Sequence, residues 1–122
     1  DLAKEFDQML SKKVPEDLES SLASLKIKDS IAGRSASNNV INYLANELPF
    51  LYGGSADLSG SDKTMIEGQD IIEKENFFGR NFKYGVREFA IAAMTSGLAH
   101  TQMILPFCGT FLPLANSNIS NT

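Results

Sequence analysis

Three short apolar runs, separated by stretches of helical pattern, constrain the fold of this chain more than any other feature. The runs are Phe50–Tyr52, the alternating side chains of Phe82, Tyr84 and Val86, and Met103–Phe107. Runs of this length with β-favouring side chains indicate strands. Because helical patterns precede and separate them, the order helix, strand, helix, strand favours an α/β fold with a mainly parallel sheet flanked by helices.

The helical patterns lie in three parts of the chain. Residues 1–31 carry leucines and other apolar side chains at helical spacing and are predicted to form a helical arm that packs on a neighbouring domain. A second helix is predicted to begin near Ala36, with Ser35 as its cap, and to end before Pro49. Small apolar residues from Phe89 to Ala99 predict a third helix that can approach a sheet closely.

Turn residues follow each predicted strand. Gly53-Gly54 follows the first run, Arg87-Glu88 the second, and Gly109-Thr110 the third. In parallel sheets ligands bind at the carboxyl ends of the strands. We therefore expect these three turns to lie along one edge and to hold any functional site.

Size and charge exclude several classes of protein. The 122 residues allow one modest domain, and the net charge of -4 argues against nucleic acid as a partner. No apolar run reaches the roughly 18–20 residues that span a membrane, and the charged start does not resemble a secretory signal, so a cytoplasmic location is expected. Cys108 is the single cysteine, which excludes an intrachain disulfide, and no metal-ligand cluster is apparent.

Four strings of sequence resemble transketolase. They are GRSASNNVI, which contains Arg34 and Ser35, GGSADL at 53–58, YGVREFA at 84–90 and GTFL at 109–112. Their order and spacing match that family from about residue 32 to residue 112. The resemblance implies that residues 32–122 are the N-terminal part of a thiamine-diphosphate-binding (pyrimidine) domain, incomplete here, and that residues 1–31 are an interdomain linker.

Transketolases transfer a two-carbon ketol unit between sugar phosphates, with thiamine diphosphate and a divalent cation such as Mg²⁺ or Ca²⁺. The resemblance implies that a preceding domain, absent from this sequence, binds the diphosphate and the cation. It also implies a homodimer in which the cofactor lies between two subunits. This chain would then supply the pyrimidine-side half of the site and be inactive alone.

The resemblance assigns the catalytic role to Glu88. The matching glutamate hydrogen-bonds a ring nitrogen of the aminopyrimidine and shares a proton with it, which helps to create the nucleophilic carbon of the cofactor. By position alone, Glu88 is more typical of an acid that complements a helix dipole; the surrounding YGVREFA string favours the catalytic role, and the two roles are compatible.

Two further residues match cofactor contacts. Phe111 matches an aromatic ring that packs on the pyrimidine, although a core phenylalanine at a strand end is an even alternative. Asp57 matches a residue near the cofactor and the subunit boundary, although a turn-capping aspartate is at least as compatible with its neighbours.

Arg34 and Ser61 match positions that bind the phosphate of the sugar substrate, where a guanidinium fork and a hydroxyl suit a dianion. Without the resemblance, Arg34 would be interpreted as a solvated charge at the start of a helix. His100 is interpreted as a C-terminal helix residue rather than a base, and Cys108 as a packed free thiol.

After Leu112 the sequence departs from the family. Leu114 and Ser117 stand where further pyrimidine-facing aromatics are expected, and a polar tail, Ala115–Thr122, replaces a helix. Two alternatives stay open: a non-catalytic interaction module with the shape of a pyrimidine domain, and another thiamine enzyme, such as a deoxyxylulose phosphate synthase or a dehydrogenase E1 component. GGSADL and the phenylalanine after Glu88 favour transketolase over that last class.

Overall fold

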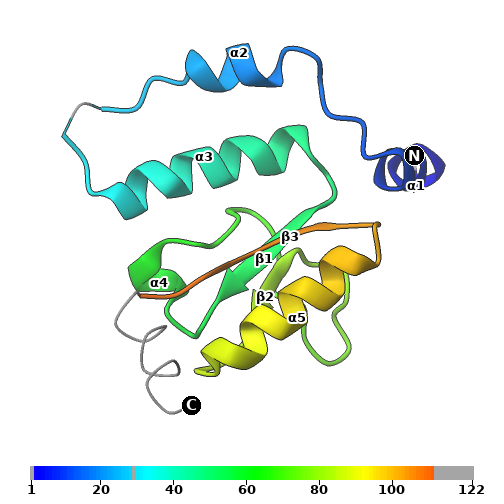
Figure 1. The fold of residues 1–122 in the computed structure, drawn as a ribbon, viewed down its shortest axis with the longest axis vertical. Coiled ribbons are helices and arrows are strands. Elements are labelled where there is room, and N and C mark those ends of the chain that lie inside the picture. Colours follow the sequence, from blue (N-terminus) through cyan, green and yellow to red (C-terminus); the bar gives the residue numbers. More distant parts are fainter. Residues whose placement is uncertain (1, 29, 112–122) are drawn as a thin grey trace.

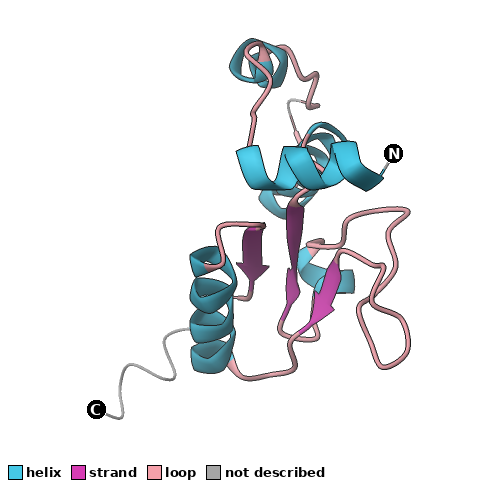
Figure 2. Cartoon of the chain, turned by 90° about the vertical axis from the view of Figure 1, so that its right-hand side faces the viewer, coloured by secondary structure: helices cyan, strands magenta, loops and turns pink. Residues whose placement is uncertain are grey.

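A three-stranded parallel sheet forms the centre of the chain, as the computed structural model shows for residues 2–28 and 30–111. The strands are β1 (Leu51–Ser55), β2 (Asn81–Lys83) and β3 (Leu105–Gly109), in the order β2-β1-β3. Both β2 and β3 pair with β1 in parallel. The predicted α/β fold with a parallel sheet is therefore confirmed, and the arrows in Figure 2 all point the same way.

Two helices cover opposite faces of this sheet. α3 (Gly33–Glu47) lies on one side and α5 (Glu88–His100) on the other (Figure 1). Successive side chains of a strand point to opposite faces. Phe107, which pairs with Gly53, therefore packs in the core beneath α3, whereas Phe82, which pairs with Gly54, packs beside Ile91 of α5.

The apolar core is divided accordingly. The larger cluster lies between α3 and the sheet and contains Ala45, Leu48, Phe50, Leu51 and Ile66. A smaller cluster of Ala56, Tyr84 and Ile91 lies under the start of α5, at the carboxyl end of the sheet.

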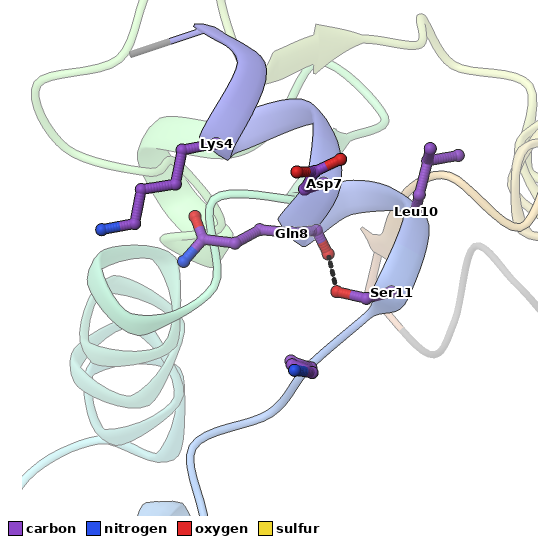
Figure 3. Close-up of a pocket in the computed structure, with 6 residues that line it drawn as sticks. Lys4, Asp7, Gln8, Leu10 and Ser11 are labelled. Carbon is purple, nitrogen blue, oxygen red and sulfur yellow. Dashed lines mark hydrogen bonds between the residues drawn. The ribbon is translucent and has the colours of Figure 1, made fainter.

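The N-terminal arm, residues 2–28, contains α1 (Leu2–Ser11) and α2 (Leu18–Ala23). Figure 1 shows it looping outside α3. Met9 and Leu18 pack against the larger core cluster, but Leu2 is 84% exposed. A recess of about 500 Å³ follows one side of α1, where Ser11 donates a hydrogen bond of 3.4 Å to the carbonyl of Gln8 (Figure 3). This recess contains none of the predicted site residues.

Two predicted boundaries were wrong. α3 begins at Gly33 with Ala32 as its cap, so Ser35 lies inside the first turn and does not cap the helix. Gly53 and Gly54 belong to β1 rather than to a turn after it. A Cβ atom at Gly53 would overlap the ring of Phe107, and one at Gly54 would overlap the carbonyl of Phe82. These glycines therefore allow close strand pairing, and the chain turns only after Ser55.

Two other differences concern element length. β2 ends at Lys83, and Val86 is 64% exposed, because the chain leaves the sheet through Gly85, whose φ is 74°. The polar segment between β1 and β2, where no helix was predicted, contains a short helix, α4 (Ser59–Asp62). The tail Ala115–Thr122, with Leu114 and Ser117, lies outside the described residues.

Candidate functional site

The carboxyl ends of the three strands bring the predicted cofactor residues to one edge of the sheet. Asp57 follows β1, Glu88 begins α5 after β2, and Phe111 follows β3. Ser55 pairs with both Lys83 and Gly109, so the three strands end at the same level. In Figure 2 the connection from β2 to the start of α5 runs along the edge where the arrowheads lie.

Glu88 is the first residue of α5, and its side chain is partly buried. One carboxylate oxygen, Oε1, is almost fully covered, yet it has no hydrogen-bond partner among the described residues. A buried acceptor without a partner costs about 1–3 kcal/mol. Such an atom fits a site where a ligand or a water supplies the missing donor.

The small cluster under α5 fixes the turn that carries Glu88. Tyr84 is 6% exposed, its ring centroid lies 5.4 Å from that of Phe82, and its backbone N–H donates to the carbonyl of Ser55 at 3.3 Å. Ile91, one turn after Glu88, packs in the same cluster. The backbone on both sides of Glu88 is therefore anchored to the sheet. Burial raises the pKa of Tyr84, although the hydroxyl of Thr95 acts in the opposite direction.

Asp57 and Phe111 line the same edge but are more accessible. Asp57 is exposed and has a φ of 58°, a left-handed conformation that aspartate tolerates better than most residues. Phe111 is 38% exposed, and the hydroxyl of the preceding Thr110 is buried without a partner. Their predicted cofactor roles stay predictions.

Arg34 belongs to α3, and Ser61 belongs to α4, whose following segment is hydrogen-bonded to α3. The side chain of Asn38 in α3 donates to the carbonyls of Lys63 at 2.9 Å and Met65 at 3.1 Å, just after α4. Arg34 lies four residues before Asn38 and so extends the same helix face. Ser61 lies in α4, two residues before Lys63. Both predicted phosphate ligands are exposed, and their predicted role stays a prediction.

Sequence reasoning missed the network that holds α4. The buried hydroxyl of Ser55 donates to Asp62 Oδ2 at 2.5 Å and accepts from the backbone N–H of Leu58 at 3.1 Å. Asp62 Oδ1 also accepts from the hydroxyl of Thr64 at 2.9 Å. This network sets the path of residues 57–61. The polar residues after the first strand were a signal, but their pairing depends on the tertiary fold.

A recess of about 510 Å³ adjoins the Glu88 turn between β2 and α5, where Phe82, Arg87, Met94 and Leu98 are among its lining residues. The sequence had led us to expect a packed thiol at Cys108, but Cys108 is exposed. It lies in β3, which is an edge strand of the described sheet. His100 is the last residue of α5, as predicted. Residues 2–28 and 30–111 contain no group of three or more potential metal ligands.

None of the helices formed by these residues is long and apolar enough to cross a membrane. A parallel sheet with an unpaired buried carboxylate oxygen at its carboxyl edge defines the class: an α/β ligand-binding domain.

Comparison with known families makes the assignment specific. The family described as "Transketolase, pyrimidine binding domain" matches residues 29–121. The chain belongs to this family.

Curated relatives agree. The chain is 40% identical over 111 residues to a transketolase of Geobacillus stearothermophilus, which covers 91% of this chain and 17% of that protein. It is 37% identical over 111 residues to a transketolase of Bacillus subtilis and 41% identical over 87 residues to one of Aquifex aeolicus. The chain thus spans about 17% of the length of the first two of these relatives.

Solved structures show the same fold. A transketolase of Pichia stipitis in complex with sedoheptulose-7-phosphate matches 98% of this chain, and 19% of its own, at a TM-score of 0.82 and 30% identity. A transketolase from Leishmania mexicana matches 93% of this chain, and 17% of its own, at a TM-score of 0.81 and 33% identity.

Proposed function

We propose that this chain supplies the pyrimidine-side half of a thiamine diphosphate site in a transketolase that transfers two-carbon ketol units between sugar phosphates. The observation that carries the proposal is the buried oxygen Oε1 of Glu88, which has no partner. A protonated ring nitrogen of an aminopyrimidine would supply the donor that this oxygen lacks. Family membership supports the same cofactor.

The other residues of the edge suit a flat aromatic ligand. Phe111 offers a partly exposed ring that can stack on it, and Asp57 lies on the neighbouring strand end. Thiamine diphosphate, when bound, supplies the nucleophilic carbon and the electron sink for breaking a carbon–carbon bond. In this proposal Glu88 holds a proton at a ring nitrogen of the cofactor's aminopyrimidine. Phe111 orients that pyrimidine ring and excludes water from it.

Arg34 and Ser61 are proposed to bind the phosphate of the sugar. The hydrogen bond from Asn38 to the carbonyl of Lys63 supports this, since Arg34 lies four residues before Asn38 and Ser61 two residues before Lys63, and both are exposed. The Pichia stipitis protein was solved with a sugar phosphate, sedoheptulose-7-phosphate. A guanidinium and a hydroxyl suit such a phosphate group.

The proposed enzyme is a cytoplasmic homodimer, and α5 supports the dimer. Its outer face exposes Phe89 at 80% and Met94 at 41%, and Ala92 and Ala93 beside them are exposed as well. A helix that is apolar on all sides is normally covered on all sides.

We also assign the divalent cation to a part of the enzyme outside this chain, as the resemblance implies. Residues 1–31 are proposed as the interdomain linker, and residues 32–122 as the N-terminal part of the pyrimidine domain.

A grafted enzyme tests the proposal. Residues 32–111 replace the matching segment of the Geobacillus stearothermophilus transketolase, and ketol transfer is measured for the graft and for Glu88→Gln within it. We expect the graft to be active and Glu88→Gln to lower kcat by about 10²–10⁴-fold, the range for a lost proton-transfer group. Glu67→Gln, an exposed carboxylate, is the matched control. An inactive graft, or full activity of Glu88→Gln, contradicts the proposal.

A further inference from the structure

One face of α5 points toward the sheet, and Glu88 belongs to it. Glu88, Ile91 and Thr95 are spaced at i, i+3 and i+7, so they lie above one another along the helix. All three are less exposed than most of the helix, and Ile91 is 3% exposed. The direction of the Glu88 carboxyl is therefore set by how α5 is rotated and seated on the sheet.

Four buried side-chain oxygens lack a hydrogen-bond partner among the described residues. They are Tyr84 Oη, Glu88 Oε1, Thr95 Oγ1 and Thr110 Oγ1. All belong to α5 or to the segments that follow β2 and β3. The proposed cofactor contact accounts for Glu88 only. Each remaining hydroxyl would cost about 1–3 kcal/mol if it stayed unpaired, so a partner for it is expected.

The position of the Tyr84 hydroxyl is fixed by the packing of its ring. The ring contacts Ala56, Ile91 and Phe82 in the smaller core cluster. Tyr84 packs against Ile91, and Thr95 lies one turn after Ile91 on the same face of α5, so the two buried hydroxyls are neighbours, although no hydrogen bond joins them. Burial raises the pKa of Tyr84, Thr95 lowers it and Cys108 raises it, which agrees with a place for Thr95 beside the tyrosine hydroxyl. A small movement of either side chain, or one buried water between them, would complete the contact.

We propose that Tyr84 and Thr95 are positioning residues whose paired hydroxyls, bonded directly or through one buried water, fix the rotation of α5 and hence the direction of the Glu88 carboxyl. The inference rests on the proposed function of Glu88. The apolar packing of Ile91 does not by itself fix the rotation of α5, because such packing is not directional. A hydrogen bond does, because its donor and acceptor must be aligned. Slipping α5 by one residue rotates it by about 100°, which would turn Glu88 away from the sheet edge.

The test uses conservative variants in the grafted transketolase described above. Tyr84→Phe and Thr95→Val each remove one hydroxyl and keep the shape of the side chain. We expect each to lower kcat about fivefold, the value of one neutral hydrogen bond, with KM for the donor sugar unchanged. Because both variants break the same contact, the double variant should be no slower than either single one. Thr95→Ser, which keeps the hydroxyl, should retain full kcat.

A second measurement needs no cofactor. The ultraviolet titration of tyrosines in the cofactor-free graft should show one tyrosine with a higher pKa in Thr95→Val than in the parent, and Thr95→Ser should restore it. Tyr84→Phe should abolish that titration.

Unchanged kcat in both single variants, or a loss of thermal stability without a change in kcat, overturns the positioning role. If Thr95→Val does not fold, Tyr84→Phe decides alone. The proposed function is judged separately, by Glu88→Gln. A loss of activity there, with Tyr84→Phe and Thr95→Val unaffected, keeps the catalytic proposal and rejects this one.

Discussion

At the scale of single residues, Tyr84 links burial to the pH dependence of stability. Its pKa is raised from 10.0, first because the ring is buried, while Thr95 lowers it and Cys108 raises it. The folded chain therefore holds this proton more tightly than the unfolded chain. The resulting stability is complete below about pH 10 and is lost as pH rises through the folded value.

Urea unfolding of the wild-type chain and of Tyr84→Phe, from about pH 8 to about pH 11, measures this effect. We expect the free energy of unfolding of the wild type to fall relative to that of Tyr84→Phe above about pH 10. The two proteins differ only in the hydroxyl of residue 84, so the difference between their free energies of unfolding isolates Tyr84. A constant difference across this range would show that Tyr84 titrates equally in both states.

At the scale of elements, the pairing of β1 with β2 depends on Gly54. A Cβ atom there would overlap the backbone carbonyl of Phe82, which cannot move without breaking the ladder. Gly54→Ala should therefore lower the free energy of unfolding by about 3 kcal/mol, the upper part of the range for overpacking. Gly60→Ala is the matched control, since nothing lies within 4 Å of a Cβ there. Equal stability of the two variants in urea unfolding would contradict this account.

The sequence predicted which elements exist better than where they end. Apolar periodicity located the strands and the helices α3 and α5, because burial in a parallel sheet requires that pattern. It failed at Gly53-Gly54, because a glycine that permits close strand pairing has the same appearance in a sequence as one that permits a turn. It also missed α4, whose residues Ser59–Asp62 have no apolar stripe and are held by the side chain of Ser55.

At the scale of the whole molecule, the grouping of Asp57, Glu88 and Phe111 could be predicted from topology, since the carboxyl ends of parallel strands meet at one edge. The buried oxygen of Glu88 could not, because it depends on the rotation of α5. The hydroxyls of Tyr84 and Thr95 escaped prediction for a related reason. They are eleven positions apart in the sequence, and only the packing of α5 on the sheet buries both of them.

The outer face of α5 gives the last prediction. Phe89 and Met94 are exposed there next to Ala93, and an uncovered apolar face of this kind favours association between copies of the chain. We expect the 122-residue chain to self-associate in sedimentation velocity, and Ala93→Arg to shift it toward monomer, because a buried unpaired guanidinium is costly. Asn46→Arg, which adds the same charge at an exposed position of α3, should leave association unchanged.

Equal effects of both variants would point to net charge as the cause, and no effect of Ala93→Arg would place the contact elsewhere. If α5 forms the contact, the turn that begins it also lies near the boundary, so Glu88 would adjoin the second subunit, as the proposed sharing of the cofactor between two subunits requires.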